Sequence, residues 1–387
     1  MFELLFLLLP IAAAYGYYMG RVFSRSKKQE EKNNQNTNYL RGVEYLLDNK
    51  QDKAVDKFIA YLNESDPSFE SGLALGNLFR KRGEVDKAIS LHEKMAADPN
   101  LEDSEHELSQ LELARDFTSA GLLDRAEAIL RTLVEIPRQR ASSAALLLKV
   151  YERERDFDKA IAVALEHRDV LGASVSRELG QYYCERASSL QLQGKTQEAI
   201  AAYKYALDIF PNSLRARLEL AQILINQKLL KEAYGYIKEA STLDSHSGLL
   251  FLDYLVQCFP NKADPQYRFA LEDLIHHTHS ASAMVELVRV TEQNSGVSDA
   301  EAMLLSYIKE KNNLKLYSAL MGVRSRDNKG NSGDALMQLK SLVDAQLASA
   351  QRFICHNCGF ESRMMFWQCP SCRKWESLKP RVGLDGD

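Results

Sequence analysis

The strongest constraint on how this chain folds is a spacing of small residues that recurs along it. The spacing is clearest between Ala187 and Pro211, where the segment reads ASSLQLQGKTQEAIAAYKYALDIFP. Ala187 and Ala199 are small enough to let two helices cross closely, and Gly194 lies at the turn between them. Pro211 ends the second helix, because proline cannot continue it. We interpret the segment as two helices joined by a tight turn.

The same spacing can be followed along the chain by the alanine that opens each second helix. These alanines are Ala54, Ala88, Ala126, Ala160, Ala199, Ala233, Ala300 and Ala335. Three of the steps between them are 34 residues and one is 35, which matches the tetratricopeptide repeat of about 34 residues. Steps of 38 and 39 residues indicate loop insertions, and the step of 67 indicates two units with a degenerate member between them.

This pattern predicts an all-α fold, a tetratricopeptide-repeat superhelical solenoid of about eight or nine units over residues 38–350. A helical bundle without a true period is the alternative. The net charge of −4 gives no indication of a nucleic-acid partner. The chain has no Gly-rich phosphate loop, no G-x-S-x-G elbow and no H-E-x-x-H motif, so we expect no catalytic residue and no enzymatic activity.

Residues 1–20 are interpreted as a retained transmembrane anchor. Residues 2–20 contain one charge, Glu3, in an otherwise apolar run, and about 20 helical residues span roughly the 30 Å of a bilayer's hydrocarbon core. Basic residues follow the run at Arg21, Arg25, Lys27 and Lys28. The positive-inside rule therefore places the bulk of the chain in the cytoplasm, with residues 21–37 as a polar tether. A cleaved secretory signal and a buried helix of the solenoid are the alternatives.

The first helix of each pair is expected to line the concave wall of the solenoid, where repeat proteins commonly hold a segment of a partner. The repeat spacing places six basic residues on the outward face of first helices. They are Arg80, Lys81, Arg115, Lys149, Arg153 and Arg215. We interpret them as a candidate basic lining for an acidic partner segment, with ordinary solvated charges as the alternative.

Residues 351–387 have a different composition and contain two C-x-x-C motifs separated by ten residues. The four cysteines are Cys355, Cys358, Cys369 and Cys372. Each motif can present two thiolates, and two such knuckles close a tetrahedron around one zinc or iron ion. A pair of disulfides is the alternative, which the cytoplasmic placement disfavours. The other two cysteines, Cys184 and Cys258, lie in helical patterns and are expected in the core.

The metal module carries more large apolar residues than about 30 residues can hide. They are Phe353, Phe360, Met364, Met365, Phe366, Trp367 and Trp375. We therefore expect the module to dock on the last repeats, from about Ala300 to Ala350.

The order of these parts resembles the lipopolysaccharide assembly protein B family of Gram-negative bacteria over essentially the whole chain. The most specific matches are the segment from Trp367 to Trp375 and the tail that contains residues 379–380 and 383–386. The family's terminal module is rubredoxin-like, which favours iron as the bound ion, with zinc a close alternative. Gly359 matches the rubredoxin knuckle, whereas Arg373 stands where a second glycine is usual.

What the resemblance implies is a regulatory role at the inner membrane. Members of the family act as a scaffold that promotes proteolysis of the lipid A-committing deacetylase by the membrane-bound AAA protease FtsH, and other lipopolysaccharide assembly proteins are further partners. A common membrane raises the effective concentration of scaffold, substrate and protease. A general adaptor in cell-envelope assembly and an iron-dependent electron-transfer protein are the alternatives.

Overall fold

A computed structural model describes residue 19 and residues 40–387 apart from 46, 49, 65–68 and 328–330. The anchor expected over residues 1–20 and the tether expected over residues 21–37 thus lie outside the described residues, with the exception of Met19. Among the helices that are described, none combines the length and the apolar composition needed to cross a bilayer.

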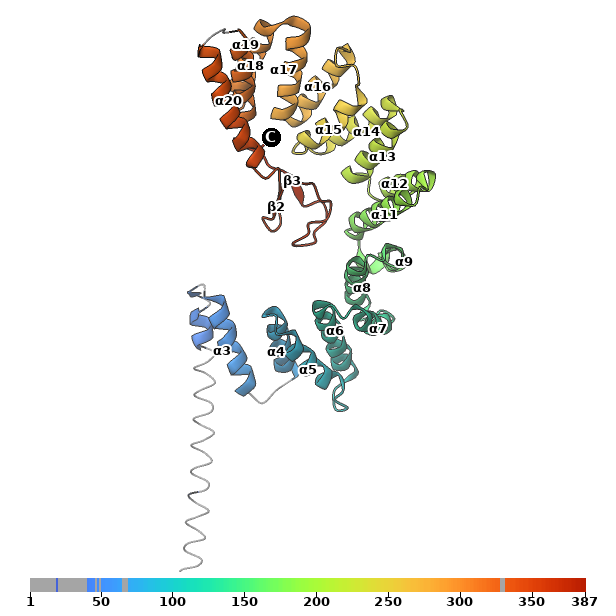
Figure 1. Cartoon of the computed structure of the whole chain (residues 1–387). Coiled ribbons are helices and arrows are strands. Elements are labelled where there is room, and N and C mark those ends of the chain that lie inside the picture. Colours follow the sequence, from blue (N-terminus) through green and yellow to red (C-terminus); the bar gives the residue numbers. More distant parts are fainter. Residues whose placement is uncertain (1–18, 20–39, 46, 49, 65–68, 328–330) are drawn as a thin grey trace, which may run out of the picture. The chain divides into compact units, whose positions relative to one another are not determined.

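The helices form two compact units (Figure 1). The first unit contains α3 (Gln51–Glu64), α4 (Phe69–Lys81), α5 (Val85–Ala96), α6 (Asp103–Ala120), α7 (Leu123–Leu133), α8 (Arg140–Glu154) and α10 (Arg168–Leu171). The second contains α11 (Val175–Leu192), α12 (Thr196–Ile209), α13 (Leu214–Asn226), α14 (Leu230–Leu243), α15 (Gly248–Cys258), α16 (Pro265–Thr278), α17 (Ala281–Ser295), α18 (Val297–Glu310), α19 (Leu314–Asp327) and α20 (Asn331–Ser349). The helix α9 (Phe157–Glu166) is divided between the two units.

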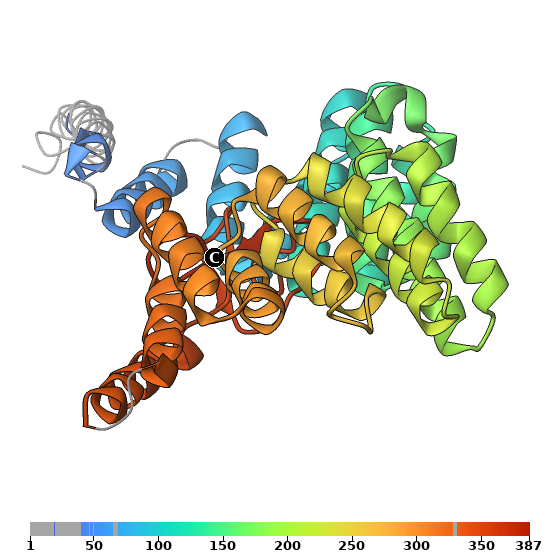
Figure 2. The same ribbon diagram turned by 90° about the horizontal axis from the view of Figure 1, so that it is seen from above.

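Within the second unit, helices pack in consecutive pairs, and the first helix of each pair also contacts the first helix of the next. Thus α11 packs against α12 and α13 against α14, while α13 contacts α15 and α15 contacts α17 (Figure 2). Two of the turns inside the pairs contain a left-handed residue. Gly194 has φ 77° between α11 and α12, and Lys228 has φ 63° at the corresponding place after α13. This is the helical-repeat solenoid that the alanine spacing predicts.

The spacing has a direct structural cause, because each repeat alanine lies where two helices cross. Seven of them are the fourth residue of a second helix and are 0% exposed: Ala54, Ala88, Ala126, Ala160, Ala199, Ala233 and Ala300. Ala335 differs, since it is the fifth residue of α20 and is exposed. The degenerate unit is the pair α15–α16, where Arg268 stands at the fourth position of α16 and Ala270 is buried instead.

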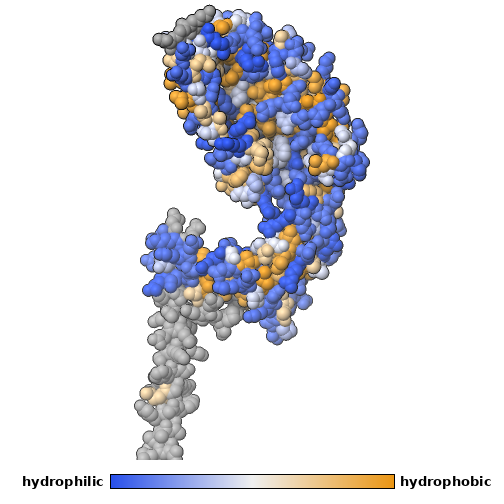
Figure 3. Space-filling view, in the orientation of Figure 1, coloured by the Kyte–Doolittle hydropathy of each residue, from blue (hydrophilic) through white to orange (hydrophobic). Residues whose placement is uncertain are grey.

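Large side chains fill the space that the alanines leave between neighbouring pairs of the second unit. Tyr182, Tyr203, Phe251 and Tyr267 are all completely buried there. On the face that Figure 3 shows, hydrophilic residues border the hydrophobic patches of this unit. Cys184 and Cys258 are buried in α11 and α15, which confirms that they are core residues. Burial raises the pKa of the Cys184 thiol to about 12.

The module after α20 contains a small antiparallel sheet, so the all-α prediction holds for the repeats only. Its strands are β1 (Phe353–Cys355), β2 (Glu361–Ser362) and β3 (Leu378–Pro380), in the order β2-β1-β3. Phe353 pairs with Ser362 on one side and with Pro380 on the other, and Cys355 pairs with Leu378. The sheet thus joins the start of the module to its end and holds the cysteine segments between them.

The buried alanines yield a test of the repeat packing. Ala233→Leu places three extra carbons in a filled helix crossing, and overpacking of this kind costs about 1–3 kcal/mol. Ala335→Leu, which adds the same atoms at an exposed position, should change the free energy of unfolding by no more than about 0.5 kcal/mol. Urea unfolding followed by far-ultraviolet circular dichroism measures both. Equal midpoints for the two variants would contradict the packing role of Ala233.

Candidate metal centre and its docking surface

The first cysteine knuckle begins at the end of β1. The N–H of Cys355 donates to the carbonyl of Phe360 (2.8 Å), and the N–H of Gly359 donates to the carbonyl of Cys355 (2.9 Å). Gly359 has φ 75°, in the left-handed region that glycine adopts without steric cost. The turn directs the side chains of Cys355 and Cys358 to the same point.

The second knuckle repeats this geometry with a different residue at the turn. The N–H of Cys369 donates to the carbonyl of Lys374 (3.1 Å), and the N–H of Arg373 donates to the carbonyl of Cys369 (2.8 Å). Arg373 has φ 58°, so it takes the conformation that Gly359 takes in the first knuckle. The substitution of arginine for glycine therefore leaves the fold of the knuckle unchanged, although a side chain at this φ carries a steric cost.

The four cysteine sulfurs come together at one point and could hold one metal ion. All four Sγ atoms lie within 4.8 Å of one another, and the Cys355–Cys372 and Cys358–Cys369 pairs are each 3.7 Å apart. A tetrahedral ion with metal–sulfur bonds of about 2.3 Å requires sulfurs roughly 3.8 Å apart. The donor set therefore fits a tetrahedral four-thiolate ion, a geometry that zinc and iron share.

Hydrogen-bond donors around the knuckles favour the thiolate form of two cysteines. Burial alone would raise the pKa of Cys355, but Ser377 and the N–H groups of the first knuckle lower it to about 6. The N–H of Lys374 lowers the pKa of Cys372. Burial raises the pKa of Cys369 to about 11, so its deprotonation depends most on a bound cation.

The module docks on the first helices of the second unit through Trp375, which is only 7% exposed. The indole meets the ring of Tyr182 on α11 edge-on, with centroids 6.5 Å apart. The guanidinium carbon of Arg215 on α13 lies 5.9 Å from the centroid of the indole ring. Beside it, Gln181 Nε2 donates to the carboxylate of Glu376 (3.0 Å).

Further contacts extend the docking surface along the solenoid. Lys379 Nζ forms an ion pair with Asp244 Oδ2 (2.5 Å), and Met365 and Trp367 pack against the hydrophobic core of the second unit. Burial raises the pKa of Glu219 on α13, and the nearby Trp367 side chain lowers it in part. These contacts join residues far apart in the sequence, so the module holds several repeats together.

The expectation that the module docks on repeats from Ala300 to Ala350 is correct only in part. The tail of the chain does reach Asn313, whose side chain donates to the carbonyl of Gly383 (2.8 Å). However, both tryptophans pack on earlier repeats, because the module folds back from α20 across the first helices α11, α13 and α15. Repeat spacing contains no information about which first helices present a matching surface.

Several of these contact residues were not singled out from the sequence. Tyr182 and Gln181 have the ordinary composition of a buried helix face. The sequence around them gives no signal, because α11 and α13 carry several other polar and charged residues.

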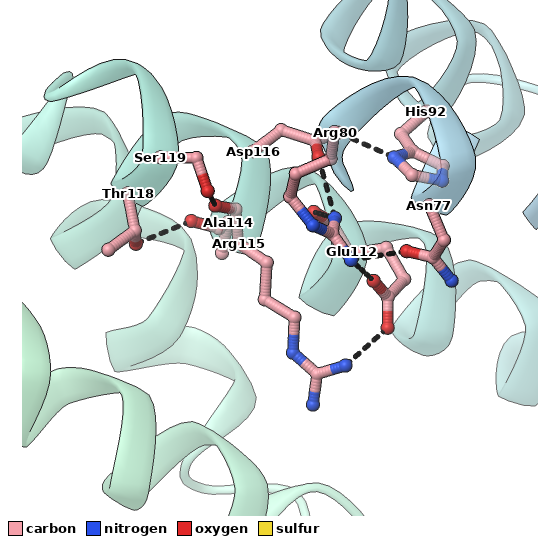
Figure 4. A network of polar contacts seen from close by, with 9 residues as sticks. All are labelled: Asn77, Arg80, His92, Glu112, Ala114, Arg115, Asp116, Thr118 and Ser119. Carbon is pink, nitrogen blue, oxygen red and sulfur yellow. Dashed lines mark hydrogen bonds and ion pairs between the residues drawn. The ribbon is translucent and has the colours of Figure 1, made fainter. Parts of the chain in front are cut away.

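The six basic residues proposed as a partner-binding lining differ in their environments. Five lie in the first unit, where Arg80 and Arg115 belong to a polar network between α4, α5 and α6 (Figure 4). Arg80 forms ion pairs with Asp116 and Glu112, both at 2.6 Å, and Arg115 forms an ion pair with the other oxygen of Glu112 at 2.5 Å. Because Asp116 is completely buried, loss of its cation would cost about 3–5 kcal/mol. Arg80 therefore stabilises the packing of the repeats.

The network continues to a buried histidine on α5. His92 Nδ1 lies 2.5 Å from Asp116 Oδ2, so this nitrogen carries the proton. Its Nε2 has no hydrogen-bond partner among the described residues and faces Gly76. A Cβ at position 76 would lie 2.3 Å from Nε2, which explains the glycine there.

Of the other four basic residues, three have exposed side chains and one is buried. Lys81 and Lys149 are exposed, and Arg153 is exposed while its guanidinium donates to the carbonyl of Thr118. Arg215, in contrast, is 5% exposed and forms an ion pair with Glu185 (2.9 Å) beneath Trp375. The interpretation of Arg215 as part of an exposed lining is therefore wrong, because the chain's own module covers it.

Loss of one metal ligand should release the module from the repeats. Cys369→Ser leaves three thiolates, so metal affinity should fall steeply and the knuckles should lose their fold. Amide hydrogen exchange should then rise in α11, α13 and α15 as well as near Asn313. Ser371→Ala changes an exposed residue of the same knuckle and serves as the control. Unchanged protection of α11 and α13 in Cys369→Ser would contradict docking that depends on the metal.

Neutralising either of two carboxylates in the docking surface should change the stability of the docked module, but in opposite directions. Burial tends to raise the pKa of Asp244, but Lys379 and Ser247 lower it, so the ionised carboxylate stabilises docking. Burial raises the pKa of Glu376, so its ionised form disfavours docking at neutral pH. At about pH 7, Asp244→Asn should therefore destabilise the docked module by about 1 kcal/mol, whereas Glu376→Gln should stabilise it.

Tryptophan fluorescence during urea unfolding measures the stability of the docked module, because the chain's two tryptophans both lie in it. The stability that Asp244 contributes is present above its ordinary pKa of 3.8 and is lost as the pH falls through the lowered value. The contribution of Glu376 has the reverse dependence. Shifts of the same sign in both variants at neutral pH would contradict this assignment of the charges.

The likeness to known proteins agrees with this architecture. Residues 353–380 match the family model of a rubredoxin metal binding domain, and residues 73–105 and 190–244 match tetratricopeptide repeat models. A solved structure of MamA is 24% identical and covers 43% of this chain and 92% of its own, with a TM-score of 0.31. At that TM-score the structural similarity says nothing about the function of this protein.

Full-length relatives are more informative. Lipopolysaccharide assembly protein B of Escherichia coli (strain K12) is 33% identical over 389 residues, which cover 100% of both chains. The protein of that name from Haemophilus influenzae (strain ATCC 51907 / DSM 11121 / KW20 / Rd) is 33% identical over 394 residues and 98% of both chains. With its repeats and its four-cysteine module in the same chain, the protein belongs to the lipopolysaccharide assembly protein B family.

Proposed function

We propose that this protein is a membrane-anchored adaptor that regulates lipopolysaccharide synthesis at the inner membrane and that it has no catalytic activity. It brings the lipid A-committing deacetylase to the AAA protease FtsH and thereby promotes proteolysis of the deacetylase. The observation that carries the proposal is the 33% identity to lipopolysaccharide assembly protein B over the whole chain. A repeat solenoid suits this role, because its extended surface can hold segments of other proteins.

In this proposal residues 1–20 anchor the chain in the inner membrane and the bulk of the chain faces the cytoplasm. The apolar run and the basic residues after it support this topology. An anchored adaptor meets a membrane-bound protease at a high effective concentration, so modest affinities suffice.

The exposed basic residues of the first unit are the proposed partner-facing part of the lining. Lys81, Lys149 and Arg153 remain exposed, whereas Arg80 and Arg115 have carboxylate partners in the repeats. Arg215 is left out because Trp375 covers it.

In this proposal the metal module binds across the repeats of the second unit and stabilises their packing. The thiolates of Cys355, Cys358, Cys369 and Cys372 would hold one ion, iron by the rubredoxin likeness with zinc the close alternative, and the bound ion would link the two knuckles. Two residues of the module hold it on the repeats: Trp375 packs on α11 and α13, and Lys379 pairs with Asp244 after α14.

The adaptor function predicts that the anchor is needed even when the rest of the chain folds. Removal of residues 2–20 should lengthen the half-life of the deacetylase severalfold and reduce capture of FtsH from solubilised membranes. The control variant carries an unrelated transmembrane segment in place of residues 2–20 and should restore turnover if the segment acts as a tether. Pulse-chase labelling and pull-down from membranes measure the two effects.

The same assay tests the surface of the adaptor. Lys149→Glu should reduce capture of a partner while leaving the thermal unfolding midpoint nearly unchanged, because Lys149 is exposed. A deacetylase half-life that does not respond to deletion of the whole chain would overturn the proposed function.

A further inference from the structure

The last residues of the chain lie against α17 and α19 as a bound peptide would. The side-chain amide of Asn313 donates to the carbonyls of Gly383 (2.8 Å) and Gly386 (3.3 Å), and the N–H of Leu314 donates to the carbonyl of Leu384 (2.8 Å). Asn313 is completely buried. All three contacts are to main-chain carbonyls, so they do not require particular side chains in the bound segment.

A carboxylate site adjoins these contacts. Asp387 Oδ1 accepts a hydrogen bond from the N–H of Ser282 in the first turn of α17 (2.9 Å) and another from Lys315 Nζ (3.2 Å). Lys315 Nζ also donates to Ser282 Oγ (2.8 Å), which holds the cation in place. The side chain of Asp387 is 4% exposed. The site thus combines a cation, a helix N-terminus and exclusion of water, which together favour a carboxylate.

The charge state of Asp387 agrees with this geometry. Burial alone would raise the pKa of its carboxyl group, but Lys315 and the donors of Ser280 and Ser282 lower it below the ordinary value. By comparison, Asp385 in the same tail is only partly exposed to solvent and lies 3.8 Å from Arg381. The carboxylate of Asp387 therefore binds to the repeats, whereas that of Asp385 lies beside a cation of the tail itself.

An open groove continues from the carboxylate site between α17, α19 and α20. Figure 1 shows these three helices at the end of the second unit. Its volume is about 450 Å³, and it shares Ser282, Lys315 and Leu347 with a smaller cavity of about 260 Å³ that Asp387 lines. The apolar part of its wall consists of Val285, Val288, Ala319, Val323 and Leu347. Its size lies within the range of known ligand pockets, roughly 300–1,000 Å³.

The charge at the carboxylate end of the groove favours an acidic occupant, because Lys315 has Asp387 of the tail as its carboxylate partner. The other cations of the lining are paired within the repeats: Arg326 with Glu292, Lys340 with Asp344, and Arg289 with Glu286. The tail fills the end of the groove with a carboxylate and leaves the apolar stretch open.

We propose that the groove between α17, α19 and α20 binds an acidic peptide segment of a partner protein, and that residues 383–387 occupy its carboxylate end in cis. The partner segment would place a carboxylate on Lys315 and Ser282, its main-chain carbonyls on Asn313 and Leu314, and aliphatic side chains in the open groove. The proposal rests on the proposed adaptor function, for which it names a binding site.

Occupation in cis makes the tail a competitor of the partner. The tail is attached to the docked module, so its effective concentration at the site is high, on the order of millimolar. A free peptide should therefore bind weakly to the intact chain. A partner held at the same membrane, or a chain whose tail is loosened, should bind much more strongly.

The test uses the full chain with its metal and a fluorescein-labelled, amidated peptide that carries residues 381–387. Fluorescence anisotropy should give at least tenfold tighter binding to the Asp387→Asn chain than to the unaltered chain, because the substitution loosens the cis tail and leaves the groove intact. Asp385→Asn is the matched control and should bind as the unaltered chain does. Adding Lys315→Gln to Asp387→Asn should remove the gain, and so should a probe with asparagine in place of its last aspartate.

A second measurement requires no variant. Millimolar probe added to the unaltered chain should increase amide hydrogen exchange at Asp387, while Ser282 and Leu314 stay protected because the probe replaces the tail. Binding of the aspartate and asparagine probes with equal affinity would overturn the proposal, and so would equal binding by Asp387→Asn and Asp385→Asn. Either result leaves the deacetylase half-life assay unaffected, so the failure of this site is distinguishable from failure of the adaptor function.

Discussion

The close crossing of helices at the repeat alanines is the contact on which the rest of the structure depends. A methyl side chain at the fourth position of each second helix brings neighbouring helices together, and the tyrosines of the core then fill the gaps that remain. This packing fixes the direction of the first helices α11, α13 and α15. Tyr182 and Arg215 on these helices meet the module, and so does Asp244 in the segment between α14 and α15.

The repeat architecture could be predicted from the sequence because its determinants are local and periodic. Ala199 and Ala233 indicate helix crossings wherever they occur, and Cys355 and Cys369 indicate a knuckle from the residues beside them. The docking surface was missed for the opposite reason. Trp375 needs a buried surface, but nothing in its own segment indicates which of the similar helix pairs presents Tyr182 and Arg215 at the right separation.

The basic residues illustrate the same limit. Arg80 and Arg215 occupy comparable places in their repeats, and both are expected to face outward from the spacing alone. Arg80 instead meets Asp116 from the next first helix, and Arg215 meets Glu185 and the indole of Trp375. A buried arginine and an exposed one have the same sequence signal, because the difference depends on partners that lie about 30 residues or more away.

Docking of the module also means that the surface on α11 is synthesised well before the module that covers it. The hydrogen bond between Gln181 and Glu376 spans 195 residues, so α11 leaves the ribosome long before its cover exists. At about 5–20 residues per second, the delay is roughly 10–40 s. During that time the surface around Tyr182 and Arg215 is open to chaperones or to other nascent chains, and it closes only after the module has been synthesised.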